Sequence, residues 1–375
     1  AQENIVDLER ESYFGGRTEA FRLGRIRNGP FSLVDVNSMY PYVMREKQYP
    51  TQLLQSLSEP PLDAVRALVA KSCVIAECDL DTDTPIYAYR QNDKLIFPTG
   101  RFTTCLCTDG IATALERGHL LRVKRCAVYQ RATIFAEYVD YWYPLKARYH
   151  KDGNKLYEQL VKLMMNSLYG KFGEKRTIDE IIDDPSAIEP SRISMYDELT
   201  NTAWTETRMF GVAIRSFGEK EGPRSMCAIA AHVTEYARLY LWSLIEKCGP
   251  SHVLYCDTDS LMVRTIDIPR VRSFLHHSRL GALIIQKEFS QLTINGAKDY
   301  EIDGARKAKG LPRKATKIGP HEYTYDHFKG LSSHLRGEPV DGVIMETVTK
   351  QFVPAYTKGR QTKSGAVKPF ELTEF

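Results

Sequence analysis

Tyr255-Cys256-Asp257-Thr258-Asp259-Ser260 is the stretch around which the rest of the chain is organised. Apolar residues flank it on both sides, with Val253-Leu254 before it and Leu261-Met262-Val263 after it. This pattern predicts a β-hairpin whose tight turn carries two carboxylates. Because residues two apart on a strand point to the same face, we expect Asp257 and Asp259 to converge on one spot.

Two carboxylates that lie close together repel one another unless a cation sits between them. Mg²⁺ suits such a site, because it prefers hard oxygen ligands and usually also holds substrate phosphates. The alternative is an ordinary hairpin turn, since aspartate is common in turns. The motifs upstream of the hairpin favour the cation site.

Composition leaves the partner of the chain open. The 375 residues are 43% hydrophobic and 26% charged, as in an ordinary globular protein with a buried core. Without a membrane-length apolar run or a signal-peptide pattern, we expect a protein that is neither membrane-bound nor secreted. Eight cysteines without a Cys-x-x-Cys pair predict reduced thiols in the cytoplasm and argue against structural zinc. The net charge of +4 is too small to identify a partner.

A further acidic residue lies near the start of the chain. Phe31-Ser32-Leu33-Val34 predicts a short buried strand that leads into Asp35-Val36-Asn37-Ser38-Met39-Tyr40-Pro41, with a helix from Tyr40 onward. Asp35 at the tip of this strand is a candidate ligand for the same cation. Its alternative role is to cap the following helix. Upstream, Tyr13-Phe14-Gly15-Gly16 taken alone is explained by a plain turn.

Two helices are predicted at residues 138–151 and 155–169, separated by Asp152-Gly153-Asn154. One face of the second helix is expected to be apolar, with Tyr157, Leu160, Val161, Met164 and Leu168. The opposite face gathers Lys162, Asn166 and Tyr169, with Gly170 at its edge. Lysine can neutralise a triphosphate, tyrosine can stack on a base, and glycine lets a base pair approach closely. Arg148 and Lys151 could add phosphate contacts, whereas a solvated face is the alternative for this helix alone.

Residues 51–137 have a mixed pattern. We expect helices over 62–70 and 109–119, and strands over 71–80, 95–103 and 122–129. The acidic residues of the first strand alternate along it, which would place Glu77, Asp79, Asp81 and Asp83 on one face. A solvated edge strand explains this alternation better than a second metal site.

Three motifs, in this order, resemble those of the family B DNA polymerases: residues 35–41, residues 162–170 and residues 255–260. Tyr13-Phe14-Gly15-Gly16 is similar to the Tyr-x-Gly-Gly element that precedes the first motif in this family. Lys298-Asp299-Tyr300 matches the Lys-x-Tyr element after the third. Protein-primed members, from phages, adenoviruses and linear plasmids, also carry two insertions, and residues 47–137 and 174–211 occupy their places.

The resemblance implies an α+β right-hand polymerase fold with an antiparallel palm, helical fingers, a small thumb and two insertions. The expected segments are an N-terminal segment with the first palm motif (1–46), the first insertion (47–137), the fingers (138–173), the second insertion (174–211), the palm with the catalytic hairpin (212–304), and the thumb with a basic tail (305–375). A long helix over 225–246 should pack behind the hairpin. The polar stretch 357–368 is expected to be mobile without DNA.

The same resemblance assigns roles to residues by position. Asp35, Asp257 and Asp259 are implied as the catalytic carboxylates and, together with Val36, as the site of two Mg²⁺ ions, for which Mn²⁺ is an alternative. The implied nucleotide-binding residues are Ser38, Met39, Tyr40, Arg148, Lys151, Lys162, Asn166 and Tyr169. Tyr40 resembles the residue that excludes a ribose 2′-OH. The implied DNA-binding residues are Tyr13, Gly15, Gly16, Gly170, Thr258, Lys298 and Tyr300. The basic cluster beyond Tyr300 adds Lys309 and Arg313 as candidates for contact with duplex phosphates, with a solvated surface as the alternative.

Two positions depart from the family pattern. Met39 stands where leucine is usual, a substitution that conserves volume. Glu158 stands one turn before Lys162, where some relatives carry a second lysine, and this leaves the set of triphosphate ligands open. Only 34 residues precede Asp35, which is too few for an exonuclease domain. We therefore expect no 3′–5′ proofreading, with a fragment of a longer polymerase as the alternative.

The implied reaction is template-directed DNA synthesis, in which a primer hydroxyl attacks the α-phosphorus of a dNTP with two divalent ions assisting. The implied partners are primer-template DNA, dNTPs and a terminal priming protein, in the replication of a virus or mobile element. Two alternatives are a polymerase-like module that only binds DNA, and a nucleotidyltransferase that uses ribonucleotides or no template. The intact carboxylates argue against the first, and Tyr40 argues against ribonucleotides.

Overall fold

The structure is a computed structural model that describes residues 2–197, 202–312, 314–328, 345–352 and 355–375. The chain divides into two compact units. The first unit consists of Ala1–Gly173, Met226–Lys309 and Pro354–Phe375, and the second consists of Glu174–Ser225 and Gly310–Val353. Among the described helices, none is both long enough and apolar enough to cross a lipid bilayer.

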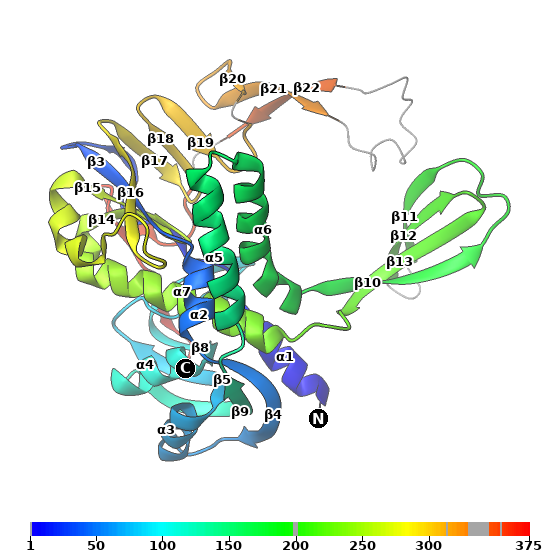
Figure 1. Cartoon of the computed structure of the whole chain (residues 1–375), viewed down its shortest axis with the longest axis horizontal. Helices are drawn as coiled ribbons and strands as arrows, with labels where there is room; N and C mark the ends of the chain where they lie inside the picture. Colours follow the sequence, from blue (N-terminus) through cyan, green and yellow to red (C-terminus); the bar gives the residue numbers. More distant parts are fainter. Residues whose placement is uncertain (1, 198–201, 313, 329–344, 353–354) are drawn as a thin grey trace. The chain divides into compact units, whose positions relative to one another are not determined.

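An antiparallel five-stranded sheet forms the centre of the first unit (Figure 1). The predicted hairpin and the predicted strand before Asp35 are both present in this sheet. In order across the sheet, the strands are β1 (Thr18–Ala20), β14 (Val253–Asp257), β15 (Ser260–Arg264), β3 (Phe31–Val36) and β16 (Leu283–Phe289). Strand β15 pairs with β3 so that Ser260 lies opposite Asp35. Two acidic stretches that are far apart in the chain therefore meet in one sheet.

Side chains alternate along these strands and cover both faces of the sheet. Val34 and Leu261 join the main hydrophobic core, which also contains α7 (Cys227–Cys248) and α2 (Met39–Glu46). Leu33 and Met262 belong to a second core on the other face. There a smaller sheet packs against them, in the order β19 (Ala305–Ala308), β18 (Asp299–Ile302), β17 (Leu292–Gly296) and β2 (Gly24–Ile26). The long helix predicted behind the hairpin is thus confirmed as α7, shifted by two residues.

Helices α5 (Ala136–Lys151) and α6 (Lys155–Phe172) form the predicted helical hairpin (Figure 1). Asn154 caps α6, because its side-chain oxygen accepts a hydrogen bond from the backbone N–H of Tyr157 at 3.3 Å. The predicted apolar face of α6 is only partly correct. Val161 is buried as expected, but Leu160 and Met164 are 46% and 42% exposed.

Four strands of a second five-stranded sheet lie within the predicted first insertion, and the fifth comes from the last residues of the chain. Its order is β25 (Glu371–Thr373), β8 (Thr99–Cys107), β5 (Cys73–Thr82), β9 (Leu120–Ala132) and β4 (Tyr49–Ser58). Ile75 on β5 packs with α1 (Gln2–Ser12) on one face. Val74 points to the other face, where α3 (Leu62–Lys71) and α4 (Thr108–Glu116) contribute to the main core. This unit also contains β6 (Tyr89–Gln91), β7 (Lys94–Ile96) and the 3₁₀ helices η1 (Pro250–His252) and η2 (Thr265–Phe274).

Two predictions for this sheet are wrong. The acidic strand β5 is central rather than at an edge, because it pairs with β8 on one side and β9 on the other. Cations on β9 compensate its acids: Asp79, only 4% exposed, lies 2.8 Å from Arg122, and Glu77 lies 2.6 Å from Arg125. The predicted strand over 95–103 is interrupted at Pro98, which separates β7 from β8.

The polar segment 357–368 has defined structure, contrary to the predicted mobility. Its strands β23 (Arg360–Gln361) and β24 (Val367–Lys368) pair with each other. Nζ of Lys358 donates a hydrogen bond to the carbonyl of Thr18 at 3.0 Å. Further along, β25 pairs in parallel with β8, where Gly100 has a φ of +87° and a side chain would collide with the carbonyl of Leu372. The predicted tail therefore belongs to the first unit.

The second unit contains two antiparallel sheets. The larger has the order β10 (Lys175–Asp183), β13 (Val212–Glu221), β12 (Thr202–Met209) and β11 (Ser191–Asp197). Because β13 pairs with β10 along its length, the sheet that begins in the predicted second insertion extends to residue 221, past the predicted end at 211. The smaller sheet has the order β20 (Thr316–Lys317), β21 (Glu322–Phe328) and β22 (Met345–Gln351).

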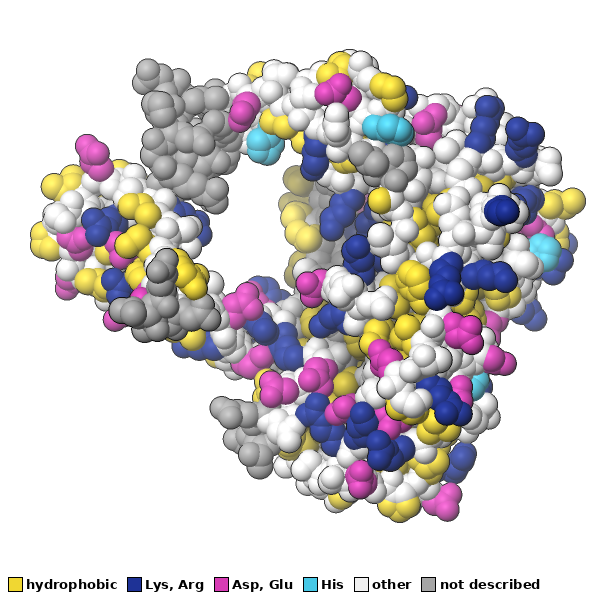
Figure 2. Space-filling model, turned by 180° about the vertical axis from the view of Figure 1, so that it is seen from behind, with side chains coloured by type: hydrophobic (Ala, Val, Ile, Leu, Met, Phe, Trp, Pro, Cys, Tyr) yellow, Lys and Arg dark blue, Asp and Glu magenta, His cyan; other side chains and the backbone are white. Residues whose placement is uncertain are grey.

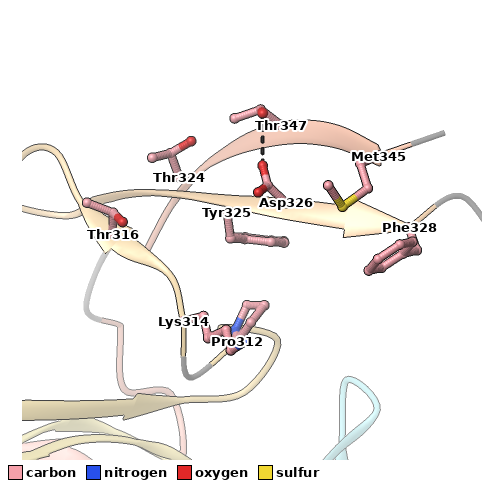
Figure 3. Close-up of a pocket in the computed structure, with 9 residues that line it drawn as sticks. All are labelled: Pro312, Lys314, Thr316, Thr324, Tyr325, Asp326, Phe328, Met345 and Thr347. Carbon is pink, nitrogen blue, oxygen red and sulfur yellow. Dashed lines mark hydrogen bonds between the residues drawn. The ribbon is translucent and has the colours of Figure 1, made fainter.

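A cavity of about 490 Å³ lies against this smaller sheet. Figure 3 shows Tyr325 pointing from β21 toward Pro312. Asp326 points away from them and accepts a hydrogen bond from the hydroxyl of Thr347 at 3.0 Å. Of the predicted site residues that the structure describes, none lines this cavity.

Candidate active site

Asp35 and Asp259 meet at one end of the central sheet. Asp35 lies on β3 between β15 and β16. Asp259 lies in the hairpin turn, which Thr258 closes with a φ of +59°. The carbonyl of Asp259 accepts a hydrogen bond from the backbone N–H of Val36 at 2.8 Å. This bond ties the turn to the strand. Asp35 is not the cap of the next helix, because Ser38 is the N-cap residue of α2, and the Ser38 side chain makes no capping hydrogen bond.

The two carboxylates repel one another in a partly buried site. Burial, and after it the charge of Asp259, raises the pKa of Asp35 to about 7, although Lys162 and Lys146 oppose the rise. Burial is also the main cause that raises the pKa of Asp259, and the charge of Asp257 adds to it. The raised pKa values of Asp35 and Asp259 mean that the nearby cations do not fully compensate the negative charges of these two carboxylates.

Asp257 has a different environment. Its Oδ1 accepts hydrogen bonds from the hydroxyls of Thr18 at 2.9 Å and Thr258 at 3.1 Å. Nζ of Lys298 lies 3.0 Å from the same oxygen. In the described part of the chain, no group of three or more acidic, histidine or cysteine side chains is arranged to hold a metal ion. The structure thus couples Asp35 with Asp259 and pairs Asp257 with a lysine.

Asp35 and Asp259 fit a divalent cation. Their hard carboxylate oxygens are the donors that Mg²⁺ and Mn²⁺ prefer. Their raised pKa values show that positive charge at this position would relieve an unfavourable interaction. Val36, which also belongs to the predicted metal site, has an apolar side chain, so only its backbone could contribute.

Lys162 on α6 brings positive charge to the carboxylates. It lies close enough to lower the pKa of both Asp35 and Asp259. Asn166, one turn further along α6, is exposed. Beyond it, Gly170 has no described heavy atom within 4 Å of the position that a Cβ would take. This face of α6 is therefore open in front of the site.

Lys146 on α5 is a site residue that the sequence did not reveal. Its Nζ donates hydrogen bonds to Oγ of Ser38 at 2.8 Å and to Oδ1 of Asn37 at 3.3 Å. Burial, and after it the charge of Lys162, lowers the pKa of Lys146. Two lysines thus share a space next to the carboxylates, and an anion between them would be favoured.

Arg148 and Lys151, the predicted phosphate ligands of α5, lie in the last turn of that helix. Arg148 is 71% exposed and lies 3.7 Å from Asp152 at the end of its own helix. Lys151 is exposed in the last turn. Lys146 follows buried Val139 by seven residues, which places both on one helix face. That register with the buried face was the signal that could have identified Lys146.

Two tyrosines from separate motifs pack against each other beside the lysines. The ring centroids of Tyr40 and Tyr169 are 4.5 Å apart, with an angle of 31° between the rings. Met39 anchors this end of α2 in the core, where it is 2% exposed. Burial, and after it the neighbouring Tyr169, raises the pKa of Tyr40, so its hydroxyl stays protonated. The pair forms a rigid aromatic wall at the start of α2.

The Tyr13-Phe14-Gly15-Gly16 segment contacts both the hairpin turn and α6. Gly16 packs against Thr258 so closely that a Cβ on Gly16 would lie 2.8 Å from the threonine side chain. Tyr13 packs in the same way against Gly173, just after α6. Arg238 on α7 donates hydrogen bonds to the carbonyls of Phe14 and Gly15 at 2.9 and 3.0 Å. The segment is therefore more than a plain turn.

The predicted DNA-binding residues after the hairpin lie near its base. The backbone N–H of Lys298 donates a hydrogen bond to the hydroxyl of Tyr255 at 2.8 Å. The ring of Tyr300 lies 5.4 Å from that of Tyr255. The backbone N–H of Lys309 donates to the carbonyl of Lys298 at 2.9 Å. Arg313 lies outside the described residues.

Figure 2 shows lysine and arginine side chains mixed with aspartate and glutamate over the face that it presents. This distribution agrees with the small net charge of +4. The local contacts of individual residues therefore identify the site better than the charge of a surface does.

We expect Asp35→Asn to stabilise the metal-free protein at pH 8. The pKa of Asp35 is raised from 3.8 to about 7 in the folded protein. Below pH 4 the side chain is protonated in both the folded and the unfolded state, so its ionisation costs no stability. As the pH rises through about 7, the folded protein has to ionise a buried carboxyl, and its free energy of unfolding falls. In EDTA at pH 8, urea unfolding should show a gain of about 2 to 4 kcal/mol for the variant.

At pH 4 this difference should nearly vanish, and Mg²⁺ at pH 8 should stabilise the unaltered protein more than the variant. The exposed Asp63→Asn serves as the control for loss of one charge. Equal unfolding free energies of Asp35→Asn and the unaltered protein at pH 8 would contradict the electrostatic description of the pair.

A family model and the relatives found by comparison with known proteins are all DNA polymerases. A family model described as DNA polymerase type B, organellar and viral, matches residues 3–200. A probable DNA polymerase of Agaricus bitorquis is 30% identical over 363 residues, which cover 87% of this chain and 44% of the relative. A DNA-directed DNA polymerase of Enterobacteria phage PRD1 is 25% identical over 325 residues, which cover 84% of this chain and 53% of the relative. The chain thus spans about half the length of these curated relatives.

The fold also matches a solved structure. Phi29 DNA polymerase complexed with primer-template DNA and incoming nucleotide substrates superimposes with a TM-score of 0.64 at 17% identity. The match covers 93% of this chain and 62% of that chain. The α+β architecture predicted from the sequence is thereby confirmed.

Proposed function

Because this chain belongs to the organellar and viral type B DNA polymerases, we propose that it catalyses template-directed DNA synthesis from dNTPs. The observation that carries the proposal is the coupling of Asp35 and Asp259 beside Lys162 and Lys146. This arrangement combines uncompensated negative charge for a metal ion with positive charge for a polyphosphate. Nucleotidyl transfer needs both.

In this proposal, different residues bind the metal, the triphosphate, the sugar and the primer. Asp35 and Asp259 would hold divalent metal, Mg²⁺ or Mn²⁺, which supplies positive charge to the oxygens of the reacting phosphate. Lys162 and Lys146 bind and orient the triphosphate. Tyr40 packs against the sugar and excludes a ribose 2′-OH. Lys298, whose Nζ lies 3.0 Å from Asp257, would contact the end of the primer.

Initiation on a priming protein is part of the same proposal. Each predicted insertion supplies most of the strands of one β-sheet, at the expected place in the chain. The matched relatives include polymerases of phages, and the proposed setting is the replication of a virus or mobile element inside a host cell. The proposed partners are primer-template DNA, dNTPs and a terminal protein. All eight cysteines are free thiols, as a reducing cytoplasm would keep them.

A primer-extension assay tests the proposal. With Mg²⁺, dNTPs and a primed template of defined sequence, we expect ordered addition of the complementary nucleotides, and no addition when the template strand is omitted. Sequencing gels of the products after incubation with single dNTPs would show the complementarity. Addition without a template, or of any dNTP regardless of the template base, would favour a template-independent transferase instead.

A further inference from the structure

The two helices of the fingers hairpin present charged residues to each other. Lys146 and His150 lie one turn apart on α5, and Glu158 and Lys162 lie one turn apart on α6. Nδ1 of His150 lies 3.2 Å from a carboxylate oxygen of Glu158. Because the helices of a hairpin run in opposite directions, this contact brings Lys146 and Lys162 to the same level.

The Glu158 carboxylate is close to the two lysines that would hold a polyphosphate. The charges of Glu158 and Lys162 both act on Lys146, in opposite directions. The side chain of Glu158 is only 26% exposed, whereas that of His150 is 77% exposed. Water and salt therefore screen the carboxylate less than they screen a surface charge. Glu158 is thus an acidic residue one helical turn from Lys162 and near Lys146.

We propose that Glu158 is a specificity-determining residue that weakens the binding of polyphosphates at Lys146 and Lys162. The inference rests on the proposed function and extends it to the balance between substrate binding and product release. A deoxynucleoside triphosphate and the pyrophosphate released from it both place several negative charges next to these lysines. A carboxylate beside them opposes each of these charges, so its effect grows with the charge of the ligand.

A purely structural role for Glu158 would behave differently. Glu158 lies in the first turn of α6, where an acidic side chain also stabilises the helix. If this were its only role, Glu158→Gln would change the binding of all nucleotides by the same factor. The dependence on ligand charge separates the two roles.

The experiment measures equilibrium binding of dNTP, dNDP and dNMP of one matching base, and of pyrophosphate, by isothermal titration calorimetry. The protein is bound to a primer-template that ends in a dideoxynucleotide, in Mg²⁺, so that no transfer occurs. For Glu158→Gln we expect about 3- to 10-fold tighter binding of dNTP and pyrophosphate, and less than about 2-fold for dNMP. The gain should shrink as the salt concentration rises.

Asp152→Asn is the matched control, because it removes one negative charge from the same hairpin, where Asp152 faces Arg148 at 3.7 Å. It should change the three nucleotide affinities little. Equal changes for dNTP, dNDP and dNMP in Glu158→Gln, or weaker dNTP binding, would overturn the role of Glu158 alone. Failure of the unaltered protein to bind dNTP at all would instead overturn the proposed function and this inference with it.

Discussion

Asp259→Asn should reduce nucleotide incorporation by a factor of about 10³ or more, because it removes one of the two charges that would hold divalent metal. Charge stabilisation by a metal ion contributes several kcal/mol to a transition state, and about 1.4 kcal/mol corresponds to a factor of ten in rate. Rapid-quench measurement of single-nucleotide addition would give the factor. Normal extension by this variant would refute the assignment of the site.

The fold and the DNA affinity should survive this substitution. The turn is held by backbone groups, since Asp259 bonds to Val36 and Asp257 through its own carbonyl and N–H. Asparagine preserves these bonds and relieves the repulsion from Asp35. DNA affinity, measured by fluorescence anisotropy in EDTA, should stay within about twofold, because phosphate contacts by cations dominate it. Glu246→Gln on α7 removes a carboxylate that pairs with Arg117 at the end of α4 and should leave incorporation unchanged.

Tyr40→Ala should relax the selection of deoxyribonucleotides over ribonucleotides by about 10²-fold. The Tyr40 ring is held against Tyr169 at 4.5 Å and cannot move aside without losing this packing. A 2′-OH that meets a fixed ring costs about 1 to 3 kcal/mol of overpacking, which the smaller side chain removes. The measurement compares kcat/KM for dNTP and rNTP of the same base in primer extension.

Tyr40→Phe is the matched control, since it keeps the ring and removes only the hydroxyl. It should retain nearly all of the discrimination. Tyr40→Ala should also lower dNTP incorporation, by up to about 10-fold, because Tyr169 loses an aromatic partner worth about 0.5 to 1.5 kcal/mol. Efficient rNTP incorporation by the unaltered protein would show that another group selects the sugar.

The sequence predicted the central sheet and its carboxylates because their signals are local. The hairpin needs only an acidic turn between two apolar runs, and β3 needs only its short apolar stretch before Asp35. The proximity of Asp35 and Asp259 is a feature of the tertiary structure. The order of the motifs indicated it through their resemblance to those of the family B DNA polymerases.

The errors arose where a side chain depends on a neighbour that is distant in the sequence. The acids of β5 look solvated in isolation, but cations on β9 pair with Glu77 and Asp79 in the middle of a sheet. On α6, the periodicity identified an apolar face, but the structure buries only its Val161 edge and leaves Leu160 exposed. A helical pattern shows which residues share a face, and it does not show how much of that face a partner covers.

Lys146 illustrates the same limit at the site itself. Basic residues are common near the ends of helices, so Arg148 and Lys151 were equally good candidates. The contacts of Lys146 depend on the register of α5 against the segment that contains Asn37 and Ser38. Such a register is set by packing in three dimensions.

The parallel pairing of β25 with β8 has a consequence for biosynthesis. Gly100 and Leu372 are neighbours in the sheet, but a ribosome that adds about 5 to 20 residues per second makes the second strand roughly 10 to 60 s after the first. During that interval β8 has a free edge, which is open to pairing with another nascent chain. Occupation of this edge by a chaperone, until β25 has been made, would therefore protect the growing polypeptide from aggregation.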